Sequence, residues 1–243
     1  MSPSACKADD LMARIKEILT KREIKRVSIE AGPLVQPEVA PLAKGPLTKG
    51  SLTKGSLTKG SLTRGSPSAS ASASALVRAG VLLPLFCKDG SYHILFTRRT
   101  DKVKRHKGEI SFPGGIYDTP DGDLSATALR EAHEEVGIKP QDVQLLGALD
   151  EVTTLTDFIV SPFVGLIPFP YVFVPSVEEI EEIIILPLSG FLKEGVLSEE
   201  DWTYQEKTAK VYTYHCGRHV IWGATAKILR QFLDLITAGG IRG

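Results

Sequence analysis

The chain has 243 residues, a length that fits one large domain or a medium-sized domain with an appendage. Its formal net charge is zero, but residues 1–75 carry 12 Lys and Arg against 6 Asp and Glu, whereas residues 76–243 carry 17 against 23. The larger part is mildly acidic, so charge alone argues against a nucleic-acid-binding protein. No apolar run reaches the ~18 residues that a bilayer requires, so we expect no membrane-spanning helix.

The three cysteines, Cys6, Cys87 and Cys216, form no spacing motif and leave one of them unpaired. Their simplest interpretation is reduced thiols in a cytoplasmic protein. The N-terminus lacks the apolar core of a secretory signal, which agrees with that location.

Residues 9–28 are predicted to form a short amphipathic helix. Leu11, Ile15, Ile18 and Leu19 make one apolar stripe, and the segment opens with acidic residues and closes with basic ones. We expect this helix to dock on the folded domain or on a neighbouring subunit, which makes a homodimer one of the predictions. A helix that binds a membrane surface or another partner is the alternative.

Residues 31–75 are of low complexity, with five pentads of the Ser-Leu-Thr-Lys-Gly type followed by a Ser-Ala run. A period of five fits neither helix nor strand, and a glycine in every unit raises the entropic cost of ordering. We interpret this stretch as a disordered basic linker. The chain then divides into residues 1–75, with the helix and the linker, and a folded domain at residues 76–243.

The folded domain is predicted to begin with two strands, Val77–Cys87 and Ser91–Thr97, around a Lys-Asp-Gly turn. The ten residues from Arg98 to Lys107 hold six cations and a His, and a run of this kind is usually a solvated loop. Here it leads through a Phe-Pro-Gly-Gly turn to an acidic helix. Positive charge beside metal-binding carboxylates suits a polyphosphate ligand.

Residues 124–138 are predicted to form that acidic helix. Glu131, Glu134 and Glu135 lie at i, i+3 and i+4, a spacing that stacks three carboxylates on one helical face. Ser125 is the predicted N-cap, and Gly137 provides a left-handed stop. One interpretation is a solvated acidic face. The other is a site for a hard divalent cation such as Mg²⁺, which takes carboxylate oxygens and shares its shell with substrate phosphates.

On this helix the chain resembles the Nudix hydrolases. Arg130, Glu131, Glu134, Glu135 and Gly137 match the REUxEExGU half of the Nudix box, and a Gly-Gly pair precedes them. This half of the box together with the Gly-Gly pair is highly specific, so the sequence favours the metal-binding interpretation of the acidic face.

The other half of the box is irregular. Gly122 stands where the family has a Glu that forms a salt bridge to the Arg, and Asp121 and Asp123 flank that place. Gly115 lies one residue before the position of the family's Gly, as if the loop carried one extra residue. The three helix carboxylates are unaffected by this irregularity.

A second resemblance is to the coenzyme A pyrophosphatases, whose signature reads LLTxRSxxLRxHxGxxxFPGG. The matching residues are Leu95, Thr97, Arg99, His106, Gly108, Phe112, Pro113, Gly114 and Gly115. Members of this subfamily share the longer box loop and have Asp at the places of Asp118 and Asp121. Thr100 and Val103 are mild departures, whereas Lys104 replaces an Arg and loses the bidentate fork that suits a phosphate.

The remaining elements extend the resemblance over roughly residues 78–236. Strands are predicted at Val143–Val152, Phe158–Pro168, Val211–Tyr214 and His219–Trp222, and a closing helix at Gly223–Ile236. An acidic segment lies between them and contains Glu178, Glu179, Glu181 and Glu182. Solvation explains these four carboxylates, and completion of a metal site by one of them is the alternative.

The resemblance implies an α/β fold, the Nudix-type α/β/α sandwich with a mixed sheet. It implies hydrolysis of the pyrophosphate bond of coenzyme A or acyl-coenzyme A, giving phosphopantetheine or its acyl form and 3′,5′-ADP. The implied cofactor is Mg²⁺ or Mn²⁺, which polarises the phosphoryl oxygens and activates the attacking water.

The site residues follow from the two motifs. Glu134 and Glu135 are the expected metal ligands, Glu131 is a third ligand or the base, and Arg130 orients the carboxylates. A backbone carbonyl of Gly115 or Gly114 is a further expected ligand. The substrate-binding residues implied by the signature are Thr97, Arg99, Lys104, His106, Gly108, Phe112 and Gly114. Arg99 and His106 are the expected contacts for a feature that separates coenzyme A from other dinucleotides, its 3′-phosphate.

Two other functions remain open at this point. One is a Nudix hydrolase that acts on NADH, ADP-ribose or another nucleoside diphosphate derivative. The other is a catalytically silent nucleotide-binding module, which the three clustered carboxylates argue against. Only the signature between Arg99 and Gly115 separates coenzyme A from the first of these.

Overall fold

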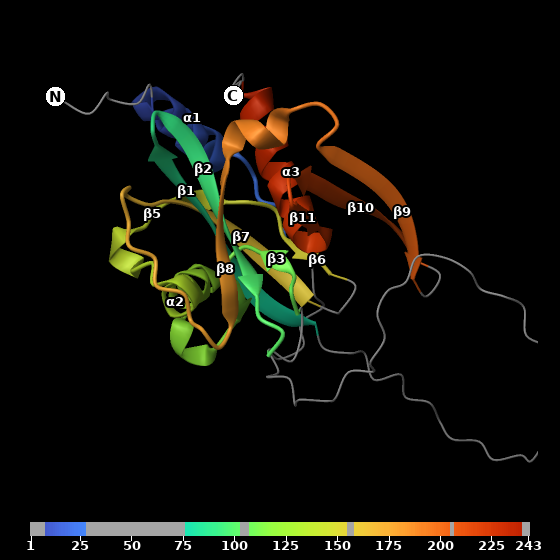
Figure 1. The fold of residues 1–243 in the computed structure, drawn as a ribbon, viewed down its shortest axis with the longest axis horizontal. Helices are drawn as coiled ribbons and strands as arrows, with labels where there is room; N and C mark the ends of the chain where they lie inside the picture. The colour runs from blue at the N-terminus through green and yellow to red at the C-terminus, as the bar shows by residue number, and fades with distance from the viewer. Residues whose placement is uncertain (1–7, 28–75, 103–106, 155–157, 205–206, 240–243) are drawn as a thin grey trace, which may run out of the picture.

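The computed structural model describes residues 8–27, 76–102, 107–154, 158–204 and 207–239 (Figure 1). The stretch predicted to be a disordered linker, residues 31–75, lies outside these ranges. The helices are α1 (Ala8–Lys21), α2 (Leu124–Val136) and α3 (Gly223–Ala238), with short 3-10 turns η1 (Thr119–Asp121), η2 (Pro140–Asp142) and η3 (Leu188–Leu192). The strands are β1 (Val77–Lys88), β2 (Ser91–Arg99), β3 (Ile110–Ser111), β4 (Gly114–Ile116), β5 (Gln144–Ala148), β6 (Val152–Thr153), β7 (Phe158–Leu166), β8 (Ile180–Pro187), β9 (Leu197–Tyr204), β10 (Lys207–Cys216) and β11 (His219–Trp222).

Strand β1 lies at the centre of an eight-stranded mixed sheet. It pairs in parallel with β7, from Val77 opposite Phe158 to Leu85 opposite Leu166, and antiparallel with β2 and β4. The order β3-β2-β1-β7-β5 is completed by β6 on β7 and β8 on β2. A strand buried on both faces is expected to be continuously apolar, as the VLLPLF run of β1 is.

The two faces of this sheet carry separate cores. Leu82 and Phe86 of β1 pack in the core that contains α2, whereas Leu83 and Leu85 belong to the core that contains α1 and α3. This alternation follows from the two-residue period of a strand. Helices therefore cover both faces of the sheet (Figure 1), and the predicted α/β/α sandwich with a mixed sheet is confirmed.

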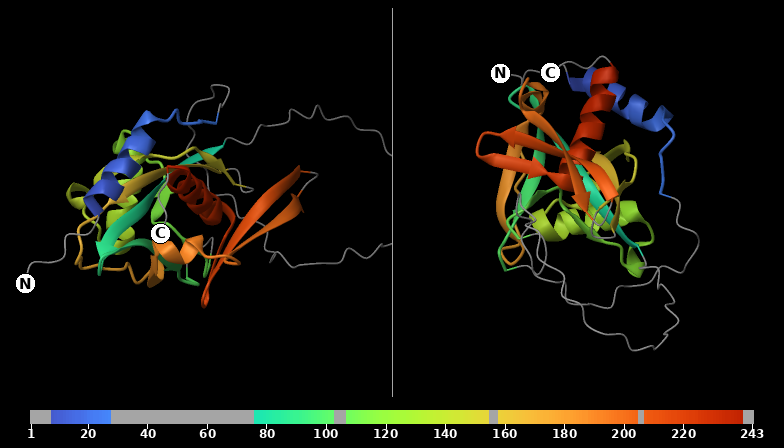
Figure 2. Two further views of the ribbon diagram at one scale, coloured as in Figure 1. Left: turned by 90° about the horizontal axis from the view of Figure 1, so that it is seen from above. Right: turned by 90° about the vertical axis from the view of Figure 1, so that its right-hand side faces the viewer.

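A second antiparallel sheet, in the order β11-β10-β9, was only partly predicted. The sequence indicated strands at 211–214 and 219–222, but β9 and β10 form a longer hairpin that projects from the body of the protein (Figure 2). Strand β9 contains Glu199, Glu200 and Asp201 in a row, which hides the alternation typical of a strand. The strand predicted at 143–152 is divided into β5 and β6.

The predicted N-terminal helix is α1, and it docks on the domain. Ile15 and Leu19 are buried in the core that also contains α3, with Met12 and Ile18 packed around them. The chain after α1 is tied to the segment between β5 and β6. Asp150 accepts hydrogen bonds from the Lys25 amide and the Arg22 side chain, and the Val27 amide donates to Glu151 at 2.7 Å. Between β5 and β6 the Glu151 amide also donates to the Lys25 carbonyl, at 3.0 Å, so the backbone there bonds to the chain after α1.

The expectation of reduced thiols holds for Cys216, which is free, but is wrong for Cys87, which is disulfide-bonded. Among the described helices, we find none with the length and apolar character needed to cross a bilayer.

Candidate active site

Helix α2 is fixed on the sheet by its apolar face. Ala128, Ala132 and Val136 are buried in the core with β1. The adjoining side of the helix, which carries Glu131 and Glu135, lies against β4 and the end of β2. The N-cap is Asp123 rather than the predicted Ser125: its side chain accepts hydrogen bonds from the Ser125 and Ala126 amides, each at 2.8 Å. Gly137 ends the helix at a φ of 75°, as predicted.

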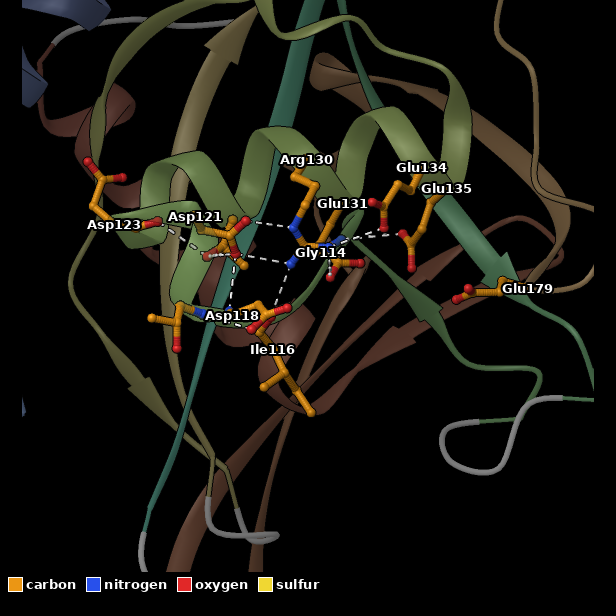
Figure 3. A network of polar contacts seen from close by, with 12 residues as sticks. Gly114, Ile116, Asp118, Asp121, Asp123, Arg130, Glu131, Glu134, Glu135 and Glu179 are labelled. Atoms are coloured by element: carbon orange, nitrogen blue, oxygen red, sulfur yellow. Dashed lines mark hydrogen bonds and ion pairs between the residues drawn. The ribbon is translucent and has the colours of Figure 1, made fainter. Parts of the chain in front are cut away.

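Arg130 lies at the centre of a network of carboxylates (Figure 3). Its Nε is 2.7 Å from Oδ1 of Asp121, and its Nη2 is 3.1 Å from Oδ2, a two-pronged ion pair. Its Nη1 is 2.8 Å from Glu131 and 3.1 Å from Glu134, and Nη2 also donates to the Ile116 carbonyl at 3.3 Å. Asp121 accepts a further hydrogen bond from the hydroxyl of Thr127. The hydrogen bonds and charge of Arg130, together with the hydrogen bond from Thr127, lower the pKa of Asp121 to about 2.

In the sequence, Asp121 is one of two acids beside the irregular box position and matches an Asp of the coenzyme A pyrophosphatase subfamily, but no partner was predicted for it. The structure gives it the salt bridge to Arg130 that a Glu makes in the Nudix box. Turn η1 makes this possible, because the Asp118 amide donates to Asp121 and holds its carboxylate toward the helix.

Glu135 is the most buried carboxylate of the cluster, with 2% of its side chain exposed. Its Oε1 is 2.8 Å from Nη1 of Arg99, and its Oε2 accepts a hydrogen bond from the Gly114 amide at 3.3 Å. Burial raises the pKa of Glu135 to about 8; the Arg99 guanidinium opposes this shift and the neighbouring Glu131 adds to it. Burial disfavours the charged form of this carboxylate, and a cation bound beside it would favour that form again.

Glu131 lies between Arg130 and the Gly114-Gly115 turn. Burial raises the pKa of its carboxyl group, and Arg130 acts in the opposite direction. A Cβ atom at Gly115 would lie 2.4 Å from the Glu131 carboxylate, closer than atoms can approach. Glycine at 115 therefore lets the β4 backbone pass directly beside this carboxylate. Glu134, by contrast, is largely exposed, with 58% of its side chain accessible.

A fourth carboxylate reaches this cluster from the connection between β7 and β8. Oε2 of Glu179 is 3.1 Å from Nη2 of Arg99, so that Arg99 bridges Glu179 and Glu135. The sequence named Glu179 only as one of four acids, with completion of a metal site by one of them as the alternative to solvation. Of the others, Glu178 and Glu181 are exposed, and Glu182 pairs with Arg98 and Arg218.

The predicted substrate-binding residues separate into three groups. Arg99 and Gly114 lie at the carboxylate cluster. Thr97 and Phe112 are buried: the Thr97 hydroxyl donates to the Ser111 carbonyl, and the Phe112 ring stacks on Phe96 with 4.8 Å between centroids. Their side chains hold β2 and the turn before β4 in place and offer no surface to a substrate. Gly108 has a φ of 67° in a turn closed by its amide on the Arg99 carbonyl, and Lys104 and His106 lie outside the described residues.

The donor set of the site suits a hard divalent cation, because it consists of carboxylate oxygens beside a backbone turn. In the described part of the chain these groups do not yet converge, and we find no three His, Cys, Asp or Glu side chains arranged around one point. The reason is visible in the ion pairs: Glu131 and Glu134 are directed to Arg130, and Glu135 to Arg99. Binding of a cation would require these carboxylates to turn from the arginines.

The chain is similar to several known proteins. The NUDIX domain family matches residues 76–194. A protein of Photorhabdus laumondii named "Uncharacterized Nudix hydrolase NudL" is 39% identical over 158 residues, which are 65% of this chain and 84% of that protein. The peroxisomal coenzyme A diphosphatase NUDT7 of Mus musculus is 38% identical over 157 residues, 61% of this chain and 65% of that protein. A solved structure, the MutT protein from Methanosarcina mazei Go1, aligns with a TM-score of 0.46 at 18% identity, over 69% of this chain and 97% of that one.

The chain therefore belongs to the Nudix hydrolase family, and it is a pyrophosphohydrolase. The similarity to NUDT7 supports the coenzyme A pyrophosphatase branch that the sequence motifs indicated. Members of the family generally use divalent metal ions.

Proposed function

We propose that the protein hydrolyses the pyrophosphate bond of coenzyme A or acyl-coenzyme A, releasing phosphopantetheine or its acyl form and 3′,5′-ADP. The structural observation that carries the pyrophosphate part of this proposal is the ion pair between Arg99 and Glu135. It brings the Arg of the coenzyme A signature into contact with a carboxylate of the Nudix box. The similarity to a coenzyme A diphosphatase supports the same substrate.

Glu131, Glu134 and Glu135 are the residues that would hold Mg²⁺ or Mn²⁺, with a backbone carbonyl of Gly115 or Gly114 as a further ligand. When bound, such an ion polarises the phosphoryl oxygens, activates the attacking water and neutralises the leaving phosphate. Arg130 pairs with Glu131 and Glu134 and holds both carboxylates near the site until they turn to the cation. Arg99 supplies a guanidinium for a substrate phosphate. Glu131 is the third ligand or the base.

The test is product analysis. The purified protein is incubated with Mg²⁺ and, in separate reactions, with coenzyme A, NADH, ADP-ribose and dATP, and the products are identified by mass spectrometry. We expect phosphopantetheine and 3′,5′-ADP from coenzyme A at a higher kcat/KM than for any other member of the panel. Faster hydrolysis of NADH or ADP-ribose would overturn the substrate while keeping the reaction class. No hydrolysis of any compound would favour a silent nucleotide-binding module.

Other expectations from the sequence stay predictions. They are a homodimer, no binding to nucleic acid, and a cytoplasmic location. The disulfide at Cys87 weighs against the last of these, because disulfides are rare in reducing compartments.

A further inference from the structure

Arg99 is shared between two carboxylates that come from different parts of the fold. Its Nη1 is 2.8 Å from Oε1 of Glu135 on α2, and its Nη2 is 3.1 Å from Oε2 of Glu179 on the connection between β7 and β8. The guanidinium thus lies with one edge on a residue of the Nudix box and the other on a residue outside the box. In Figure 3, Glu179 lies beyond Glu135 on the side away from Arg130.

Glu179 is held in this place by its backbone. Its carbonyl accepts a hydrogen bond from the Thr100 amide at 2.8 Å, and its amide donates to the Ser176 carbonyl at 3.0 Å. The Ser176 amide in turn donates to the Glu135 carbonyl at 2.9 Å. The same short segment is therefore tied to the residue after Arg99 and to the end of α2, which fixes Glu179 relative to both partners of the bridge.

A divalent cation bound to Glu135 would weaken this bridge. The cation and the guanidinium are both positive and would compete for the same buried carboxylate, and at equal distance the doubly charged cation has the larger Coulomb attraction. Arg99 then loses one of its two partners. Glu179 is the partner that remains, and it leaves Nη1 of Arg99 free beside the site of cation binding.

We propose that Glu179 is a positioning residue: it retains Arg99 when Glu135 turns to the divalent cation, and so presents the guanidinium to the pyrophosphate of the substrate. Planar, two-pronged recognition of phosphate is the contact for which Arg is suited. This inference rests on the proposed function only in so far as the substrate contains a pyrophosphate. It does not depend on whether coenzyme A is that substrate.

The test distinguishes two roles for Glu179: positioning of Arg99, and direct binding of the cation. Methylenediphosphonate, a non-hydrolysable pyrophosphate analogue, is titrated by calorimetry in the presence of Mg²⁺ into Glu179→Gln, Arg99→Gln and the double variant. We expect each single substitution to weaken binding about tenfold or more, because each removes or misplaces a charge-assisted contact with the phosphate. If Glu179 acts through Arg99, the double variant binds within about twofold of Arg99→Gln.

Glu178→Gln is the matched control. It removes the same charge one residue away, from a side chain that is 77% exposed and 3.9 Å from Lys102, whereas Glu179 is 49% exposed. We expect it to bind the diphosphonate like the unmodified protein. Thermal melts of all variants establish that the fold is retained.

A second measurement excludes the competing role. Mn²⁺ affinity is determined by electron paramagnetic resonance without diphosphonate, and we expect Glu179→Gln to reduce it less than tenfold. A loss of tenfold or more that Glu178→Gln does not share would make Glu179 a metal ligand and overturn the proposal. Unchanged diphosphonate binding in either single variant would also overturn it, and so would a further tenfold loss in the double variant. None of these outcomes depends on which nucleotide the enzyme hydrolyses.

Discussion

Asp121 pairs with Arg130 through both of its carboxylate oxygens, at 2.7 Å and 3.1 Å, although Asp121 belongs to turn η1 and Arg130 to the middle of α2. The carboxylate is 5% exposed and also accepts from the Thr127 hydroxyl and the Asp118 amide. It is therefore fixed to the start of α2 at several points. Because Arg130 also contacts Glu131 and Glu134, the position of two proposed metal ligands depends on this ion pair.

Replacement of Asp121 by Asn should destabilise the protein and impair the site together. The folded-state pKa of about 2, against 3.8 for a free Asp, corresponds to about 2 kcal/mol of stabilisation at neutral pH. Urea unfolding should show a loss of this size in Asp121→Asn. Asp123→Asn is the matched control, since Asn keeps the N-cap oxygen and removes the same charge two residues away. Equal stability of the two variants would contradict the role given to Asp121.

The same ion pair predicts a dependence of stability on pH. The pKa of Asp121 is lower in the folded state than in the unfolded state, so between about pH 4 and pH 2 the unfolded chain binds more protons. Stability then rises with pH: the contribution of Asp121 is fully present above about pH 5 and is lost as pH falls toward 2. The difference in unfolding free energy between the unmodified protein and Asp121→Asn should shrink over this window. A constant difference would mean that the carboxylate is not paired as described.

The elements that the sequence predicted well are those with local causes. The apolar run of β1 and the alanines and Gly137 of α2 determine strand and helix without reference to distant residues. The partner of Arg130 was not predictable in this way. Asp121 and Asp123 stand on either side of the box position, and only the geometry of η1 sends one to the arginine and the other to the helix N-terminus.

Glu179 illustrates the same limit over a longer range. It is one of four neighbouring acidic residues, and the sequence alone does not distinguish those that lie in solvent from the one that reaches the site. Its contact with Arg99 depends on how β8 and the preceding segment lie against β2 and α2, a tertiary arrangement that no local pattern encodes. The apolar stripe of α1 likewise predicted which face of the helix is buried, but it did not predict the residues against which that face packs.

Glu134→Gln and Glu135→Gln should each lower kcat by about a hundredfold or more in the presence of Mg²⁺. The reason is that the amide replaces a charged oxygen ligand, and the reaction depends on the charge of the bound ion. Glu181→Gln, on an exposed position of β8, is the control and should retain full turnover. Steady-state kinetics on the substrate found by product analysis, with near-ultraviolet circular dichroism for the fold, provides the measurement. Near-normal turnover of either variant would remove that residue from the proposed metal site.

The packing of α1 predicts that this helix contributes to the stability of the domain. Leu19 is 4% exposed, and a Cβ atom at Gly147 would approach its side chain to 2.7 Å, which shows how closely the helix lies on β5. Leu19→Ala should lower the free energy of unfolding by about 2–4 kcal/mol, the usual cost of truncating a buried leucine. Lys16→Ala, on the exposed side of the same helix, should change it by less than about 0.5 kcal/mol. Equal urea midpoints for the two variants would show that α1 does not dock in solution.

The last prediction concerns which phosphate Arg99 contacts. The sequence suggested the 3′-phosphate, because that group distinguishes coenzyme A from NADH and ADP-ribose. In the structure, however, Arg99 lies 2.8 Å from Glu135, in the carboxylate cluster where we propose that the pyrophosphate is cleaved. A guanidinium in this place serves a group that coenzyme A and its 3′-dephospho analogue have in common.

Arg99→Ala should therefore lower kcat/KM on coenzyme A and on 3′-dephospho-coenzyme A by the same factor, roughly ten- to a hundredfold for one charge-assisted phosphate contact. Lys102→Ala is the control, because this exposed cation follows Arg99 closely in the chain and pairs only loosely, at 3.9 Å, with Glu178. A thermal melt accompanies each variant, since Arg99 also neutralises the buried Glu135. A loss confined to coenzyme A would assign Arg99 to the 3′-phosphate and contradict the position seen here. An equal loss leaves recognition of the 3′-phosphate to other residues, and Lys104 and His106 of the same signature are the next to be substituted.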